Sequence, residues 1–120
     1  MSRILAVDDS RSMREMVAFT LTSAGFKVAQ AEDGAIALDL ARKEKFGLLL
    51  VDVNMPNMDG IALIKALRGE ADYKFTPMLM LTTEAAADRK QEGKAAGATG
   101  WIVKPFNPEQ LVATVQRVLG

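Results

Sequence analysis

Four apolar runs in this chain each end in polar side chains that can do chemistry. In chain order, these endings are Asp8-Asp9, Asp52, Thr82 and Lys104. A short apolar run between polar residues is typical of a strand buried on both faces. Open parallel sheets bind their ligands beyond the carboxyl ends of the strands. Residues that serve only to end strands need not combine carboxylates, a hydroxyl and an ammonium. We therefore expect these side chains to form a single ligand-binding site.

The run 48–51 shows how one of these groups is positioned. It consists of four aliphatic residues and ends directly in Asp52. Met55-Pro56 and Asp59-Gly60 then prevent the strand from continuing and predict a loop just beyond the carboxylate. Taken by itself, Asp52 can simply end a strand.

Three carboxylates meet if the strand before Asp8-Asp9 lies beside the strand before Asp52. Crowded like charges repel one another, and a bound cation relieves that repulsion. All-oxygen ligands suit Mg²⁺, which binds one or two carboxylates together with water and a substrate phosphate. The sequence therefore predicts a Mg²⁺ site at this edge of the sheet.

Together these motifs resemble the response-regulator receiver domains of two-component signalling, and among them the single-domain chemotaxis regulators of the CheY type. The resemblance covers essentially the whole chain. It is carried by Asp8-Asp9, Asp52 with Met55-Pro56 and Asp59-Gly60, the strand end at Thr82, and Lys104-Pro105-Phe106. It also implies a cis bond between Lys104 and Pro105.

The resemblance implies the reaction. Asp52 is then the phosphoacceptor, taking a phosphoryl group from a histidine of a partner kinase, as carboxylate nucleophiles can. Lys104 pairs with the phosphoryl oxygens, and the Thr82 hydroxyl donates a hydrogen bond to one of them. The ordinary interpretation of Thr82 is a helix cap, and Thr83 competes with Thr82 for either role. The ordinary interpretation of Lys104 is a solvated lysine.

The metal ligands are likewise implied by the resemblance. Asp9, Asp52 and the backbone carbonyl of Asn54 would bind Mg²⁺ directly, and Asp8 would hold it through water. Asp8 or Asp9 can instead cap the first helix.

Trp101 occupies the place where the family carries an aromatic switch residue that moves inward when Thr82 is drawn to the phosphoryl group. Its ordinary interpretation is a core residue. The resemblance implies an output face made of the fourth helix, the fifth strand and the fifth helix. The expected partners are a sensor histidine kinase and a downstream protein such as a flagellar motor component.

Helical spacing between the apolar runs completes the pattern. Expected helices run from Ser10 or Ser12 to Gly25, from Glu32-Asp33 to about Lys43, from Gly60 to about Arg68, from Thr83-Glu84 to Gly97 or Gly100, and from Asn107 onward. The segment 26–31 predicts a weaker edge strand. This alternation predicts an α/β fold, a (βα)5 doubly wound parallel sheet. The resemblance implies the flavodoxin-like, CheY-like strand order 2-1-3-4-5.

The fourth helix lacks a bulky anchor. Its candidate core positions are Ala85 to Ala87, Ala95 and Ala96, and Gly93 inside it costs about 1 kcal/mol relative to Ala. Two interpretations remain open: close packing against the sheet through small side chains, and a weakly held helix that can shift.

Composition narrows the function classes. The 120 residues predict one receiver domain, 1–120, with enough apolar residues for a core. Net charge is zero and no basic stripe is present, so we expect no nucleic-acid partner. Cysteine and histidine are absent, which excludes disulfides, thiol chemistry and a phosphohistidine on this chain. With no signal peptide or apolar span of membrane length, we expect a cytoplasmic monomer with no membrane contact.

The predicted function is phosphorelay signalling, in chemotaxis, by a switch that catalyses only its own phosphorylation and dephosphorylation. Alternatives are a receiver domain of a longer transcriptional regulator, a phosphorelay intermediate, and a flavodoxin-like cofactor-binding protein. The last alternative lacks a Gly-rich phosphate loop after the first strand. Acidic residues at that place would also repel a phosphate in the absence of a metal.

Overall fold

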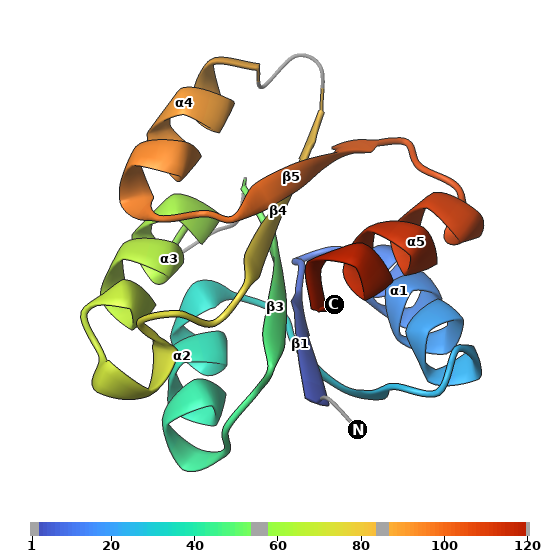
Figure 1. The fold of residues 1–120 in the computed structure, drawn as a ribbon, viewed down its shortest axis with the longest axis horizontal. Helices are drawn as coiled ribbons and strands as arrows, with labels where there is room; N and C mark the ends of the chain where they lie inside the picture. Colours follow the sequence, from blue (N-terminus) through green and yellow to red (C-terminus); the bar gives the residue numbers. More distant parts are fainter. Residues whose placement is uncertain (1–2, 54–57, 84–86, 120) are drawn as a thin grey trace.

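The computed structural model describes residues 3–53, 58–83 and 87–119. Five parallel strands form one sheet in the order β2-β1-β3-β4-β5, and helices alternate with them along the chain (Figure 1). The elements are β1 Arg3–Val7, α1 Arg11–Ser23, β2 Lys27–Ala31, α2 Gly34–Lys43, β3 Leu48–Asp52, α3 Gly60–Arg68, the 3₁₀ helix η1 Ala71–Tyr73, β4 Met78–Thr83, α4 Ala87–Ala96, β5 Gly100–Lys104 and α5 Pro108–Leu119. The predicted fold class and strand order are confirmed.

The sheet separates two apolar clusters. Helices α1 and α5 cover one face, and α2, α3 and α4 cover the other (Figure 1). Strand side chains alternate between the faces: Leu5 and Val7 of β1 pack toward α2 and α3, whereas Ile4 and Ala6 pack toward α1 and α5. All five residues of β3 are buried, as expected for the central strand of a sheet covered on both faces.

Side-chain caps fix where four helices begin. In each case a side-chain oxygen accepts a hydrogen bond from the backbone N–H three residues later. The four capping residues are Ser10, Asp33, Asp59 and Asn107. Ser10, and not Ser12, therefore begins α1. The Asn107 backbone N–H in turn donates to Gln110 Oε1 at 3.1 Å, which completes a capping box.

The edge position of β5 corrects one expectation. Strand β5 pairs only with β4, and its side chains are mostly half-buried. Ile102 is 7% exposed, but Trp101 is 41% exposed. The expectation of a fourth fully buried strand is therefore wrong, and so is the interpretation of Trp101 as a core residue.

Helix α4 packs on the sheet through its smallest side chains. Gly93 and Ala96 are buried, whereas Ala95 is exposed, so the prediction that Ala95 is a core position is wrong. A Cβ at Gly93 would collide with the Met80 side chain, and this close approach sets which face of α4 is buried. Gly97, at φ 114°, ends the helix. Of the other core positions predicted for α4, Ala85 and Ala86 lie outside the described residues, as does the Ala87 side chain.

Among the described helices, none is both long enough and apolar enough to cross a bilayer.

Candidate functional site

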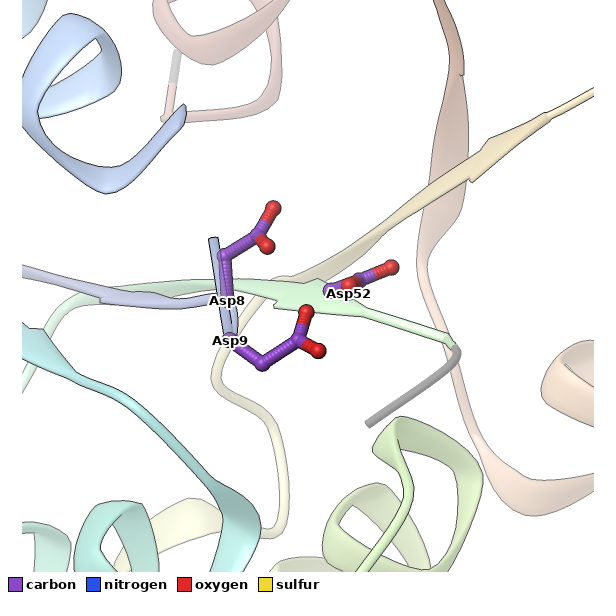
Figure 2. A group of neighbouring side chains, drawn as sticks. All are labelled: Asp8, Asp9 and Asp52. Carbon is purple, nitrogen blue, oxygen red and sulfur yellow. The ribbon is translucent and has the colours of Figure 1, made fainter. Parts of the chain in front are cut away.

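The three predicted carboxylates lie together at the carboxyl ends of β1 and β3 (Figure 2). These strands are neighbours, with Val7 opposite Val51, so Asp8 and Asp52 follow at the same edge of the sheet. One oxygen from each of Asp8, Asp9 and Asp52 lies within 4.8 Å of the others. Asp8 and Asp52 are 2% and 7% exposed, while Asp9 is exposed to solvent.

Asp8 is held by contacts on both carboxylate oxygens. Its Oδ1 accepts a hydrogen bond from the Ser10 backbone N–H at 2.9 Å, and its Oδ2 accepts one from Lys104 Nζ at 3.0 Å. Arg14 also donates from Nη1 to the Asp8 backbone carbonyl at 2.7 Å. Sequence reasoning missed Arg14, because its position on α1 carries no signal that its side chain turns back toward β1.

Lys104 brings positive charge to two of the carboxylates. Its Nζ lies 3.0 Å from Asp8 Oδ2 and 3.5 Å from Asp52 Oδ1, and its side chain is 17% exposed. One ammonium cannot balance three carboxylates, and burial weakens the water screening that would otherwise moderate the repulsion. This donor set of carboxylate oxygens therefore fits a hard divalent cation.

Thr82 lies at the same edge, on the strand next to Asp52. Asp52 is opposite Leu81 in the register of β3 and β4, so Thr82 extends one residue further. The residue is 2% exposed, and its hydroxyl donates to the Thr83 carbonyl at 3.3 Å. Thr83, the competing candidate, is exposed.

Gly60 allows the start of α3 to lie directly against the backbone of Asp52. A Cβ at this position would collide with the Asp52 carbonyl oxygen, so only glycine lets α3 begin here. The Gly60 N–H also donates to the Val53 carbonyl at 3.2 Å. Asn54, the predicted carbonyl ligand, and Met55-Pro56 lie outside the described residues.

Trp101 lies on the other side of β4, beside a groove between β5 and α5. The groove is lined by Trp101, Phe106, Gln110 and Arg117 among others. Lys104 lines it too and so connects the groove to the acidic site. The Lys104-Pro105 bond at the end of β5 is cis, as the resemblance implies.

A family model of the response regulator receiver domain matches residues 4–116. The chain belongs to this family. Receiver domains of this type are signalling switches and generally bind Mg²⁺, which agrees with the acidic cluster.

Several of its relatives are chemotaxis regulators. The chain is 38% identical to "Chemotaxis protein CheY" of Pseudomonas aeruginosa, over 97% of this chain and 94% of the relative. It is 41% identical to a "Chemotaxis protein CheY homolog" of Campylobacter jejuni, over 98% and 92%. The solved structure of Vibrio cholerae CheY4 superposes with a TM-score of 0.94 and 58% identity, over 98% of each chain. The receiver domain is therefore a homologue of the CheY chemotaxis regulators, consistent with a phosphorelay response regulator.

Proposed function

We propose that this receiver domain is a phosphorelay switch in chemotaxis that accepts a phosphoryl group from a histidine kinase on the Asp52 carboxylate. The observation that carries the proposal is the meeting of Asp8, Asp9 and Asp52 within 4.8 Å, with Lys104 Nζ 3.5 Å from Asp52. A carboxylate nucleophile beside an ammonium, with two further carboxylates that can hold a metal ion, matches the positioning and charge neutralisation that phosphoryl transfer requires.

In the proposed reaction an Asp52 oxygen attacks phosphorus, and the phosphorus–nitrogen bond to the kinase histidine breaks. The electron pair of that bond returns to the imidazole of the kinase. Lys104 is already at the carboxylate and pairs with the phosphoryl oxygens. The Thr82 hydroxyl, which now donates to the neighbouring Thr83 carbonyl, turns to a phosphoryl oxygen.

The acidic residues hold a Mg²⁺ ion in this proposal. Asp9 and Asp52 would bind it directly, and Asp8, already engaged by Ser10 and Lys104, would contribute through water. Asn54 remains a predicted carbonyl ligand. When bound, the ion supplies positive charge that offsets the charge of the carboxylates and of the phosphoryl group.

The output in this proposal is a change of the face made by α4, β5 and α5. CheY-type receiver domains interact with histidine kinases and downstream targets. For this chain we propose a flagellar motor component as the downstream partner, as the resemblance to single-domain chemotaxis regulators implies. Trp101 lies half-exposed on that face, so it has somewhere to move when Thr82 turns inward.

Incubation with acetyl phosphate and Mg²⁺, followed by intact mass measurement, tests the proposal. One phosphoryl adduct is expected, stable in acid and labile in base. Asp52→Asn should abolish it, because an amide is a poor nucleophile and a poor ligand for a hard metal. Asp39→Asn, at an exposed position on α2, is the matched control and should be modified like the wild type. Equal adduct in the Asp52→Asn variant, or in excess chelator, would contradict the assignment.

A further inference from the structure

Two consecutive cationic residues on α4 contact two different parts of the molecule. Arg89 pairs through Nη2 with Asp59 Oδ2 at 3.1 Å, reaching the first residues of α3. Lys90 places its Nζ 5.5 Å from the centroid of the Trp101 ring, on β5. A cation at this distance over an indole ring is attracted to it. Helix α4 thus contacts both the Asp59 carboxylate and the aromatic residue of the proposed output face.

Asp59 is fixed relative to Asp52 by short contacts. Its Oδ1 caps α3 by accepting the Ala62 N–H at 2.8 Å, while its Oδ2 faces Arg89. The next residue, Gly60, bonds the Val53 carbonyl and leaves no room for a Cβ against the Asp52 carbonyl oxygen. The carboxylate that Arg89 contacts therefore cannot move far without moving the backbone of Asp52.

The described side chains of α4 bury little apolar surface. In the part of α4 whose side chains the structure describes, only Gly93 and Ala96 are buried, and neither provides a bulky anchor. Polar contacts of the helix then matter more than they would on α3, where Leu63, Ile64 and Leu67 are fully buried. Arg89 can hold the helix in place through such polar contacts, because its side chain is only 27% exposed and also pairs with Glu92 at 3.2 Å.

We infer that Arg89 and Lys90 couple the start of α3, at Asp59 and Gly60 beside Asp52, to Trp101 through α4, by a connection that does not use the Thr82 hydroxyl. Arg89 is a positioning residue that holds α4 against the start of α3, and this position keeps Lys90 at the Trp101 ring. The inference rests on the proposed function, because it makes the Asp59–Arg89 pair part of the switch that Asp52 phosphorylation operates.

The expected effects are modest, since both contacts are partly exposed. An ion pair or a cation–π contact of this kind changes a two-state equilibrium about twofold to fivefold. Such a factor is measurable because Trp101, the sole tryptophan, reports by its fluorescence the equilibrium between the two positions of α4.

The test is a double-mutant cycle read by Trp101 emission and acrylamide quenching, in the absence of any phosphodonor. Arg89→Ala breaks the pair from one side. Asp59→Asn breaks it from the other while keeping the cap on α3, because asparagine is an equally good N-cap residue. Each variant should change the quenching constant in the same direction, and the double variant should change it no further than either single variant.

Three further variants separate coupling from general loosening. Arg89→Lys keeps the charge and should restore part of the wild-type signal. Lys90→Met keeps the aliphatic stem, and in its background Arg89→Ala should no longer alter Trp101. Arg42→Ala breaks the exposed Arg42–Glu70 pair, 2.9 Å, which does not involve α4, and should leave Trp101 unchanged.

Additive effects of Arg89→Ala and Asp59→Asn, or an unchanged Trp101 signal in Arg89→Ala, would overturn the inference. Because no phosphodonor is present, this outcome is independent of the chemistry of Asp52. A wild-type protein that forms no adduct with acetyl phosphate, yet shows the non-additive cycle, would instead contradict the proposed function.

Discussion

The two ends of the strands differ in how their buried polar groups are satisfied. At the amino ends, the Tyr73 hydroxyl lies 2.6 and 2.8 Å from the carbonyl oxygens of Ala41 and Glu44, which share its one proton. It also accepts the Phe46 N–H at 3.2 Å, and the residue is only 1% exposed. Each neutral group here has a partner, and the hydroxyl joins the end of α2 to the start of β3.

At the carboxyl ends the same sheet gathers like charges. Oxygens of Asp8, Asp9 and Asp52 lie within 4.8 Å of one another, and the Lys104 ammonium pairs with Asp8 and Asp52. The amino ends are therefore arranged for stability, whereas the carboxyl ends hold like charges close together at some cost in stability, as the proposed binding of a cation and a phosphoryl group would require. The contrast predicts that substitutions at the carboxyl ends of the strands affect mainly switching, whereas substitutions at the amino ends affect mainly folding stability.

The largest effect is expected for Thr82→Ala, and it should affect switching and not folding. A hydrogen bond from a hydroxyl to a charged phosphoryl group is worth about 1.5–3 kcal/mol, enough to invert a two-state equilibrium with a gap of that size. The variant should still accept phosphate on Asp52 but lose most of the phosphorylation-dependent change in Trp101 emission and quenching. The full fluorescence change in Thr82→Ala would show that Thr82 is not the coupling residue.

At the opposite end, Tyr73→Phe should lower the free energy of unfolding by about 1–3 kcal/mol, measured by urea denaturation. Removal of the hydroxyl leaves the Ala41 and Glu44 carbonyls and the Phe46 N–H without their partner. Phosphorylation of Asp52 should be unaffected. A variant as stable as the wild type would show that this end of the sheet is not where stability resides.

The pH dependence of unfolding gives a second check on Tyr73. Burial raises the pKa of its hydroxyl above the ordinary value of 10.0; the hydrogen bond from the Phe46 backbone partly offsets this, and the charges of Asp72, Glu70 and Glu44 raise the pKa further. The folded state therefore keeps this proton when the unfolded chain begins to lose it. Stability from this group is fully present below pH 10 and falls as the pH rises above it. The difference in unfolding free energy between wild type and Tyr73→Phe should shrink over that range.

The smallest effect is expected for Mg²⁺ on thermal stability. At ten times its dissociation constant, an ion that binds only the folded state stabilises it by about 1.4 kcal/mol. Asp9→Ala should remove this response and should also stabilise the metal-free protein slightly, because one of three repelling charges is gone. The control is Asp39→Ala. A normal Mg²⁺ response in Asp9→Ala would argue against direct ligation by Asp9.

Short-range patterns in the sequence were sufficient for most of the fold. Apolar runs gave the strands, and cap residues such as Asp33 and Asn107 gave the helix starts, because a cap and its N–H partner are three residues apart. The grouping of Asp8, Asp9 and Asp52 followed once their strands were taken as neighbours. Phosphorylation, metal binding and the role of Thr82 stay predictions.

What the sequence did not reveal depends on contacts between distant residues. The Arg89–Asp59 pair joins residues 30 positions apart, and neither side chain signals the other. The exposed Ala95 and buried Gly93 are set by the fit of α4 against Met80, which helical spacing cannot determine. Tyr73 lies between the expected helix that ends at about Arg68 and the apolar run before Thr82, and an isolated aromatic there gives no period from which burial can be inferred.

The most direct test of the central claim locates the phosphoryl group among the three clustered carboxylates. Borohydride reduces an acyl phosphate to an alcohol, which converts the phosphorylated aspartate to homoserine. After incubation with acetyl phosphate and Mg²⁺, reduction and peptide mass spectrometry should find homoserine at position 52 only. Homoserine at position 8 or 9, or its absence throughout the chain, would contradict the assignment of Asp52 as the phosphoacceptor.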